Sequence, residues 1–187
     1  MATSMSQIST LLNNLGLKFV FDEKQDVIMT GFGTQVYRDR SNDQGVMLVI
    51  SLHDDGQYLR ISAPYCFAVM DREYLRAAQA ACSAANFQFR LGRFVVDPND
   101  GEVSLVVEDA VLDTQLTQQQ LASLLGLFPS VLDMFDDLIR TAVETGEVID
   151  PEDPAEVMRA FQEFMQSRRQ RRPVFAMGLG EMRIGVA

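Results

Sequence analysis

Apolar and polar residues follow two different periods along the first third of the chain. Apolar residues recur at i, i+3, i+4 and i+7 from Ile8 to Leu15, with Ser and Thr before them and Gly16 after them. This spacing predicts a short capped amphipathic helix. Apolar residues then alternate over 17–21, and an apolar run over 27–32 follows a polar turn, so these two segments are expected to pair as a hairpin.

A second hairpin has the clearest turn in the chain. Residues 46–52 are apolar and rich in β-branched side chains, and residues 57–63 alternate again. Between them, Asp55 and Gly56 form a pair that readily adopts the positive φ angles of tight hairpin turns. We therefore expect two antiparallel strands here.

The next predicted element is a helix with unusually small side chains on one face. Asp71 is its expected capping residue, and the helix should end at Asn86. The small face consists of Ala77, Ala78, Ala81, Cys82 and Ala85. Such a face either lies close on a sheet or forms the seam of a homodimer.

The third hairpin and the last helix of the body follow. Residues 87–96 and 102–108 are expected to pair around a turn rich in Asp, Asn and Gly. Thr117 and Gln120 then form a capping box, and the apolar stripe that follows keeps one helical phase across Pro129. One kinked helix ending near Gly146 is therefore predicted.

These elements give the order α-β-β-β-α-β-β-α and an α+β fold. We expect an antiparallel sheet of about five strands with helices packed on it. An acidic stretch containing Pro151 and Pro154 marks a boundary, so residues 1–147 should form the domain and residues 148–187 an appendage.

The appendage combines an amphipathic helix, an arginine cluster and an apolar tail. The helix carries Val157, Met158, Phe161, Phe164 and Met165, and the tail carries Phe175, Met177 and Leu179 among its apolar residues. The helix face either folds back on the body or captures a partner protein, because Met and Phe suit adaptable binding surfaces. The tail is expected to dock on the body's own groove or on a neighbouring chain.

Charge is distributed unevenly, and this limits the classes of partner. The first 166 residues hold 11 basic and 25 acidic residues, whereas the last 21 hold five basic and one acidic residue. The acidic body argues against nucleic-acid binding, which needs a basic face. The basic cluster comprises Arg168, Arg169, Arg171 and Arg172. It is expected to contact the acidic body, an acidic partner or an anionic membrane surface.

Other features favour a soluble protein of the bacterial cytoplasm. The polar residues 1–9 lack the features of a secretory signal, and no stretch offers the apolar length of a membrane span. Cys66 and Cys82, the two cysteines in the chain, are expected to be small buried residues without a redox role.

The sequence offers weak candidates for chemistry. His53, the single histidine, stands beside Asp54 and Asp55, but these residues suit a hairpin turn better than a metal or acid-base site. Neither cysteine has a histidine nearby in sequence. We therefore expect no catalytic residue, no metal and no cofactor.

A family resemblance adds to this interpretation. The sequence RFVVDPNDGEV at residues 93–103, followed by Asp113 and by LTQQQL at 116–121, resembles the signature region of the YbjN family of bacterial sensory transduction regulators. The order of elements is also similar to that of type III secretion chaperones. The resemblance extends over residues 1–147. It implies a compact α+β domain that binds a partner polypeptide without catalysis, often as a dimer.

The main functional hypothesis is therefore a non-enzymatic, chaperone-like or regulatory module. It would hold a polypeptide segment of a partner or the chain's own tail. The alternative is a membrane-surface adaptor that uses the arginine cluster and the apolar tail. An enzyme with an unrecognised site is a third alternative.

Overall fold

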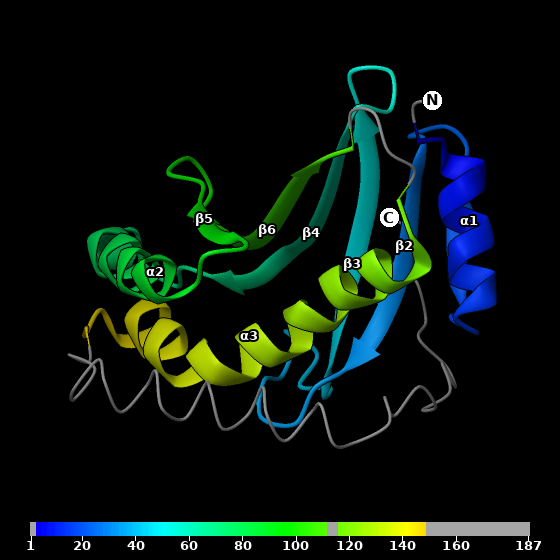
Figure 1. Cartoon of the computed structure of the whole chain (residues 1–187). Coiled ribbons are helices and arrows are strands. Elements are labelled where there is room, and N and C mark those ends of the chain that lie inside the picture. The colour runs from blue at the N-terminus through cyan, green and yellow to red at the C-terminus, as the bar shows by residue number, and fades with distance from the viewer. Residues whose placement is uncertain (1–2, 112–115, 149–187) are drawn as a thin grey trace.

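A computed structural model describes residues 3–111 and 116–148 of the chain (Figure 1). In this part, one six-stranded antiparallel sheet packs with three helices, so the expected α+β class is confirmed with one strand more than the predicted five. The elements are α1 (Met5–Asn14), β1 (Phe19–Asp22), β2 (Val27–Gly33), β3 (Gly45–His53), β4 (Tyr58–Ala68), η1 (Arg72–Tyr74), α2 (Leu75–Gln88), β5 (Arg93–Val96), β6 (Glu102–Ala110) and α3 (Gln118–Thr145).

Local capping residues define the two helices that the sequence predicted best. Ser4 and Gln7 form a capping box at the start of α1, and Thr117 and Gln120 form the expected one at the start of α3. Helix α3 continues through Pro129 and ends at Gly146, which adopts a left-handed φ of 77°. The single long helix predicted across this proline is confirmed.

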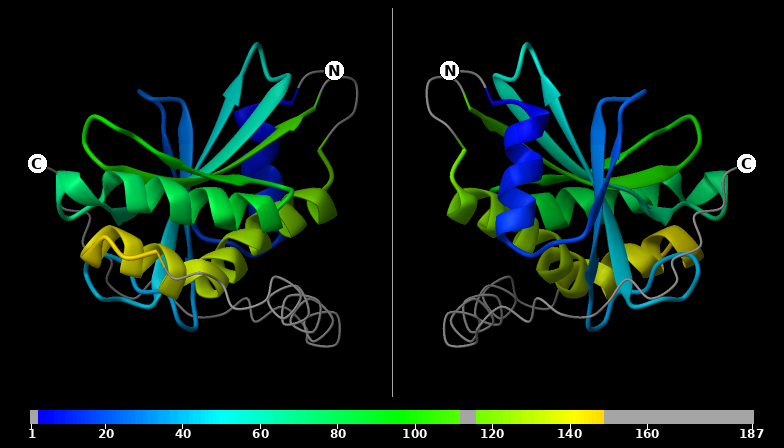
Figure 2. Two further views of the ribbon diagram at one scale, coloured as in Figure 1. Left: turned by 90° about the vertical axis from the view of Figure 1, so that its left-hand side faces the viewer. Right: turned by 90° about the vertical axis from the view of Figure 1, so that its right-hand side faces the viewer.

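The sheet order is β1-β2-β3-β4-β6-β5. Each of the three predicted hairpins is present, and β6 inserts between β4 and β5. The inward residues of the sheet form the core with α1 and α3; the largest of them that are fully buried are Ile28, Leu48, Ile50, Leu59, Ile61 and Leu105. This order leaves β5 as an edge strand, and α2 packs beside it (Figures 1 and 2).

The region around α2 differs from the sequence prediction. Asp71 caps a short 3₁₀ turn, η1, and α2 then continues to Gln88. The strand expected over 87–96 is therefore wrong in its first half, and only Arg93–Val96 is extended. Helical hydrogen bonding continues because the Phe89 N–H donates to the Ala85 carbonyl, and the buried Phe89 side chain holds this end of α2 on the core.

Strand β4 also exceeds its predicted length. It runs to Ala68 through an irregularity between Ala63 and Phe67, where Tyr65 adopts a φ of 49°. A positive φ is uncommon for a bulky residue and fits a β-bulge. The bulge lets β4 continue beside β6 down to the β5–β6 turn.

The β2–β3 connection is attached to α3 by a carboxylate. Asp133 accepts hydrogen bonds from the backbone N–H groups of Gln35, Val36 and Tyr37 at 2.9–3.0 Å. The buried Tyr37 hydroxyl donates to the Cys66 carbonyl at 2.7 Å, and burial raises the pKa of Tyr37. One aspartate thus fixes a loop that lies about 100 residues earlier in the chain.

Within residues 3–111 and 116–148, no helix combines the length and hydrophobicity that a membrane crossing requires.

Candidate functional site

The turn that contains His53 is exposed, and its residues adopt the backbone angles of a tight hairpin turn. His53 Nε2 lies 3.0 Å from Ser51 Oγ at the end of β3. Asp54 and Asp55 have φ angles of 50° and 55°, as the hairpin turn requires. In the two described ranges, no group of three or more His, Cys, Asp or Glu side chains could hold a metal ion.

Both cysteines lie in the core. The Cys66 thiol donates to the Val103 carbonyl at 3.1 Å, and burial raises its pKa above the ordinary value. Burial also raises the pKa of Cys82 to about 12. A thiol that stays protonated is a poor nucleophile, so both side chains act here as small buried residues.

We expect both thiols to react slowly in the folded protein. Because their pKa values are raised above the ordinary value of 9.0, folded chains should be alkylated by iodoacetamide at least about a hundredfold more slowly than unfolded chains. Unfolded chains lose these protons first as the pH rises above about 9, so the free energy of unfolding should fall there. Mass spectrometry and pH-dependent urea titrations measure the two effects. Equal alkylation with and without urea would contradict this prediction.

The small face of α2 is buried by contacts within a single chain. Ala78, Ala81, Cys82 and Ala85 are all at most 3% exposed, because α2 packs against α3 and β5. Ala77 is half-buried beside them. The face therefore provides close packing of a helix, and a homodimer stays a prediction that these four buried residues do not support.

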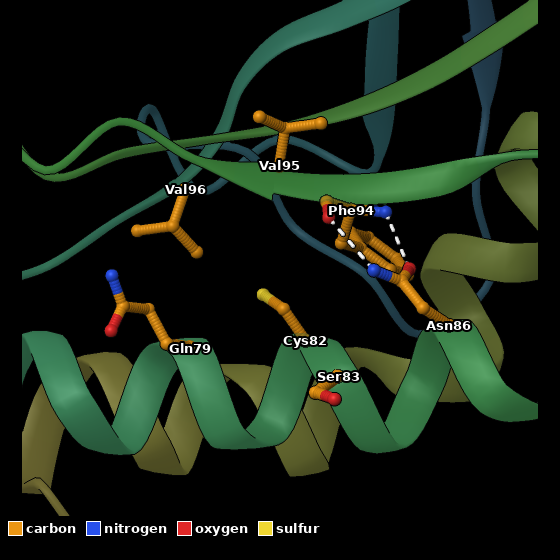
Figure 3. Close-up of a pocket in the computed structure, with 7 residues that line it drawn as sticks. All are labelled: Gln79, Cys82, Ser83, Asn86, Phe94, Val95 and Val96. Carbon is orange, nitrogen blue, oxygen red and sulfur yellow. Dashed lines mark hydrogen bonds between the residues drawn. The ribbon is translucent and has the colours of Figure 1, made fainter.

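An open groove of about 320 Å³ lies between α2 and β5, and we name it the α2–β5 groove (Figure 3). Its lining residues are Gln79, Cys82, Ser83, Asn86, Phe94, Val95 and Val96. Figure 3 shows that Gln79 and Cys82 rise from α2 toward β5, that Val96 points down between them, and that Val95 points away from the helix. The groove thus has an apolar floor and a polar wall.

One side of the α2–β5 groove is the free edge of the sheet. The Asp97 N–H donates to the Glu102 carbonyl. Residues of an antiparallel strand bond to the neighbouring strand alternately, so the backbone of Val95 bonds to β6. The backbone N–H and C=O groups of Phe94 and Val96 therefore face outward. Asn86 satisfies Phe94, because its side-chain amide accepts from the Phe94 N–H at 2.7 Å and donates to the Phe94 carbonyl at 3.0 Å. Among the described residues, none bonds the outward N–H and C=O of Val96. An unpaired edge of this kind accepts an added strand.

Exposed apolar side chains occur on α2, on β5 and on the segment between them. Phe87 is 88% exposed, Leu91 is 62% exposed and Val95 is 41% exposed. All three belong to α2, β5 or the segment that joins them. Val95 lies on the side of β5 that points away from α2, so these side chains do not all face the α2–β5 groove.

The described chain ends close to the same groove. The N–H groups of Val69 and Met70 donate to Gly101 and Val143, so residues 69–74, the β5–β6 turn and the end of α3 meet. A Cβ on Gly146 would clash with the Tyr74 ring, just before α2 begins. We call residues 69–74, 97–101 and 143–148 the C-terminal corner.

The remaining candidates from the sequence lie outside the described residues. They are Val157, Met158, Phe161, Phe164 and Met165, the arginines Arg168, Arg169, Arg171 and Arg172, and the tail residues Phe175, Met177 and Leu179. Their roles in binding a partner, an acidic surface or lipid stay predictions.

Comparison with known proteins places this fold. The family model YbjN, described as "Putative bacterial sensory transduction regulator", matches residues 4–141. The chain belongs to the YbjN family. A similar solved structure is the crystal structure of YbjN from E. coli, titled a putative transcription regulator, with a TM-score of 0.52 and 16% identity over 73% of this chain and 89% of that one. No curated protein matches the chain. At this identity, the solved YbjN structure shows a shared fold.

The sequence prediction missed most of the α2–β5 groove in this YbjN-family chain. Gln79, Ser83 and Asn86 follow each other at helical spacing and form a polar stripe beside the small face of α2. That spacing was visible in the sequence. The position of Val96 was not, because it depends on which strand lies at the edge of the sheet.

Proposed function

We propose that this YbjN-family protein is a non-enzymatic regulatory adaptor of the bacterial cytoplasm that holds an extended polypeptide segment in the α2–β5 groove. The observation that supports this most is the outward backbone of Val96 beside an open groove. An extended peptide would gain two main-chain hydrogen bonds there and bury apolar surface against Cys82 and Val96. The segment belongs to a partner protein or to the chain's own tail, as in a chaperone-like module.

A pair of variants on α2 tests the groove. Ser83 lines it and is exposed, whereas Ala80 is exposed on the same helix without being among the lining residues. Ser83→Arg should fill the groove with a long charged side chain, and Ala80→Arg adds the same side chain elsewhere. Arg is a good helix former, so both variants should keep α2.

The readout is quantitative mass spectrometry of proteins captured from lysate of the native organism by the full chain and both variants. We expect a partner that Ala80→Arg retains and that Ser83→Arg loses by about tenfold or more. Equal capture by all three baits would contradict binding in the groove. Empty capture by every bait, with sedimentation on anionic vesicles, would favour the membrane-surface alternative instead.

A further inference from the structure

We propose that residues 174–179 of this same chain bind in the α2–β5 groove as a short strand added to β5. This inference rests on the proposed function, because it names the occupant that holds the groove when no partner is bound. It predicts a self-occupied state of the protein that a partner segment must displace.

The edge of β5 offers an added strand the backbone groups of Val96, which no described residue bonds. Asn86 already satisfies the backbone of Phe94, so the added strand would bond Val96 and continue toward the β5–β6 turn. Alternate side chains of that strand would face α2, where Cys82 and Ser83 line the groove. The others would lie on the side to which Val95 points.

The sequence of the proposed segment matches these two sides. Phe175, Met177 and Leu179 are large and apolar, and they alternate with the small residues Ala176 and Gly178. Val174, at the start of the segment, falls on the same side as the small residues. An extended chain separates these two sets onto opposite sides. The large side chains at 175, 177 and 179 would fill the groove above α2, and beyond Val174 the small ones would leave the outer side open.

The described chain ends at a place from which this segment reaches the groove. Val148 belongs to the C-terminal corner, where Gly146 lies against Tyr74. Gln79 of the groove is five residues further along the chain, which is about 7.5 Å in a helix. The 25 residues between Val148 and Val174 can span far more than this distance, even in a bent path.

Charge supports the same placement. In the C-terminal corner, the β5–β6 turn carries Asp97 and Asp100 without a basic residue. Glu144 in the last turn of α3 pairs with Arg140 at 3.4 Å, and Glu147 follows the helix. The Glu102 N–H and the Tyr65 hydroxyl lower the pKa of Asp100, which keeps it charged. Asp71 and Glu73 are balanced by Arg72 and Arg76. The tail arginines just before residue 174 would therefore meet a net acidic surface.

Amide hydrogen exchange of the full-length protein tests the inference at one residue. The Val96 N–H should be protected in the full chain, although no described residue bonds it. Phe175→Asp should accelerate its exchange by about tenfold or more, because a charge would enter the apolar side of the groove. Ala176→Asp, on the opposite side of the same strand, should change the rate by less than about twofold. The Phe94 N–H, which Asn86 binds, is the internal reference.

The groove variants complete the test. Ser83→Arg should release the segment and accelerate Val96 exchange as Phe175→Asp does, whereas Ala80→Arg should not. Fast Val96 exchange in the unmodified chain, or equal responses to Phe175→Asp and Ala176→Asp, would overturn the inference. Protection that weakens on dilution would also overturn it, because the occupant would then be a second copy.

This inference and the proposed function can fail separately. A partner lost by Ser83→Arg, with Val96 exchange insensitive to Phe175→Asp, would leave the proposed function and remove the self-occupied state. Conversely, tail-dependent protection of Val96 without a captured partner would support the inference and contradict a partner-binding adaptor.

Discussion

We expect Asp133→Ala to lower the free energy of unfolding by about 2–3 kcal/mol. The carboxylate accepts the N–H groups of Gln35, Val36 and Tyr37, and no other described group takes them. Val36 is exposed, so water can replace the carboxylate there, but Tyr37 is only 2% exposed and its N–H would lose a charged partner. Loss of this bond should also loosen the contacts that Tyr37 makes in the core.

Those contacts make the effect larger than that of an ordinary surface bond. The Tyr37 ring meets Phe67 edge to face at 5.4 Å, and the Arg140 guanidinium lies 5.9 Å from the Tyr37 ring centre. Arg140 also binds Asp136 at 2.7 Å and the Arg38 carbonyl at 2.8 Å. A displaced β2–β3 connection would therefore disturb several groups at once.

Urea unfolding followed by circular dichroism measures the change. Asp137→Ala is the matched control, because Asp137 lies on the same helix and is exposed. It should change stability by less than about 0.5 kcal/mol. Similar losses in the two variants would show that Asp133 contributes only as a surface charge.

The second large effect is expected from Gly92→Ala, which should destabilise the fold by about 2–3 kcal/mol. A Cβ at Gly92 would lie 2.6 Å from Phe89 Cε1, 2.8 Å from the Val106 carbonyl oxygen and 2.9 Å from Val107 Cγ2. The Val106 carbonyl belongs to β6, which is paired on both sides, so it cannot move away easily. The cost is a displaced start of β5, and this would also change the α2–β5 groove.

Gly33→Ala provides the comparison. A Cβ at Gly33 would meet its nearest heavy atom, the Gln44 carbonyl oxygen, only at 4.0 Å, and its φ is not positive. This variant should be neutral or slightly more stable, because alanine restricts the unfolded chain. Thermal unfolding of both variants separates the steric effect at Gly92 from a general glycine effect. Equal shifts in their melting temperatures would contradict the packing argument.

The predictions that succeeded from sequence rest on short-range interactions. The capping box of Thr117 and Gln120, the positive φ of Asp55 and the continuous stripe across Pro129 each depend on residues a few positions apart. The YbjN signature over 93–121 also lies in one continuous segment, and the family match over 4–141 agrees with it.

The error at residues 87–92 has a different cause. Phe87 and Phe89 resemble strand residues locally, yet the helix continues to Gln88 because α2 is held by buried contacts with α3 and β5. The packing of Ala81 and Ala85, which the sequence assigned to the helix face, extends the helix beyond the position that Asn86 indicated. Tertiary contacts here outweighed local preference.

The sequence by itself therefore determined most of the secondary elements and their α+β class, because each is encoded in neighbouring residues. Only the tertiary structure decided that β5 lies at the sheet edge, that Asn86 binds the Phe94 backbone and that Asp133 holds a loop 96–98 residues away. These features depend on the order in which strands pair and on contacts between distant segments. The periodicity of a single segment carries no information about either.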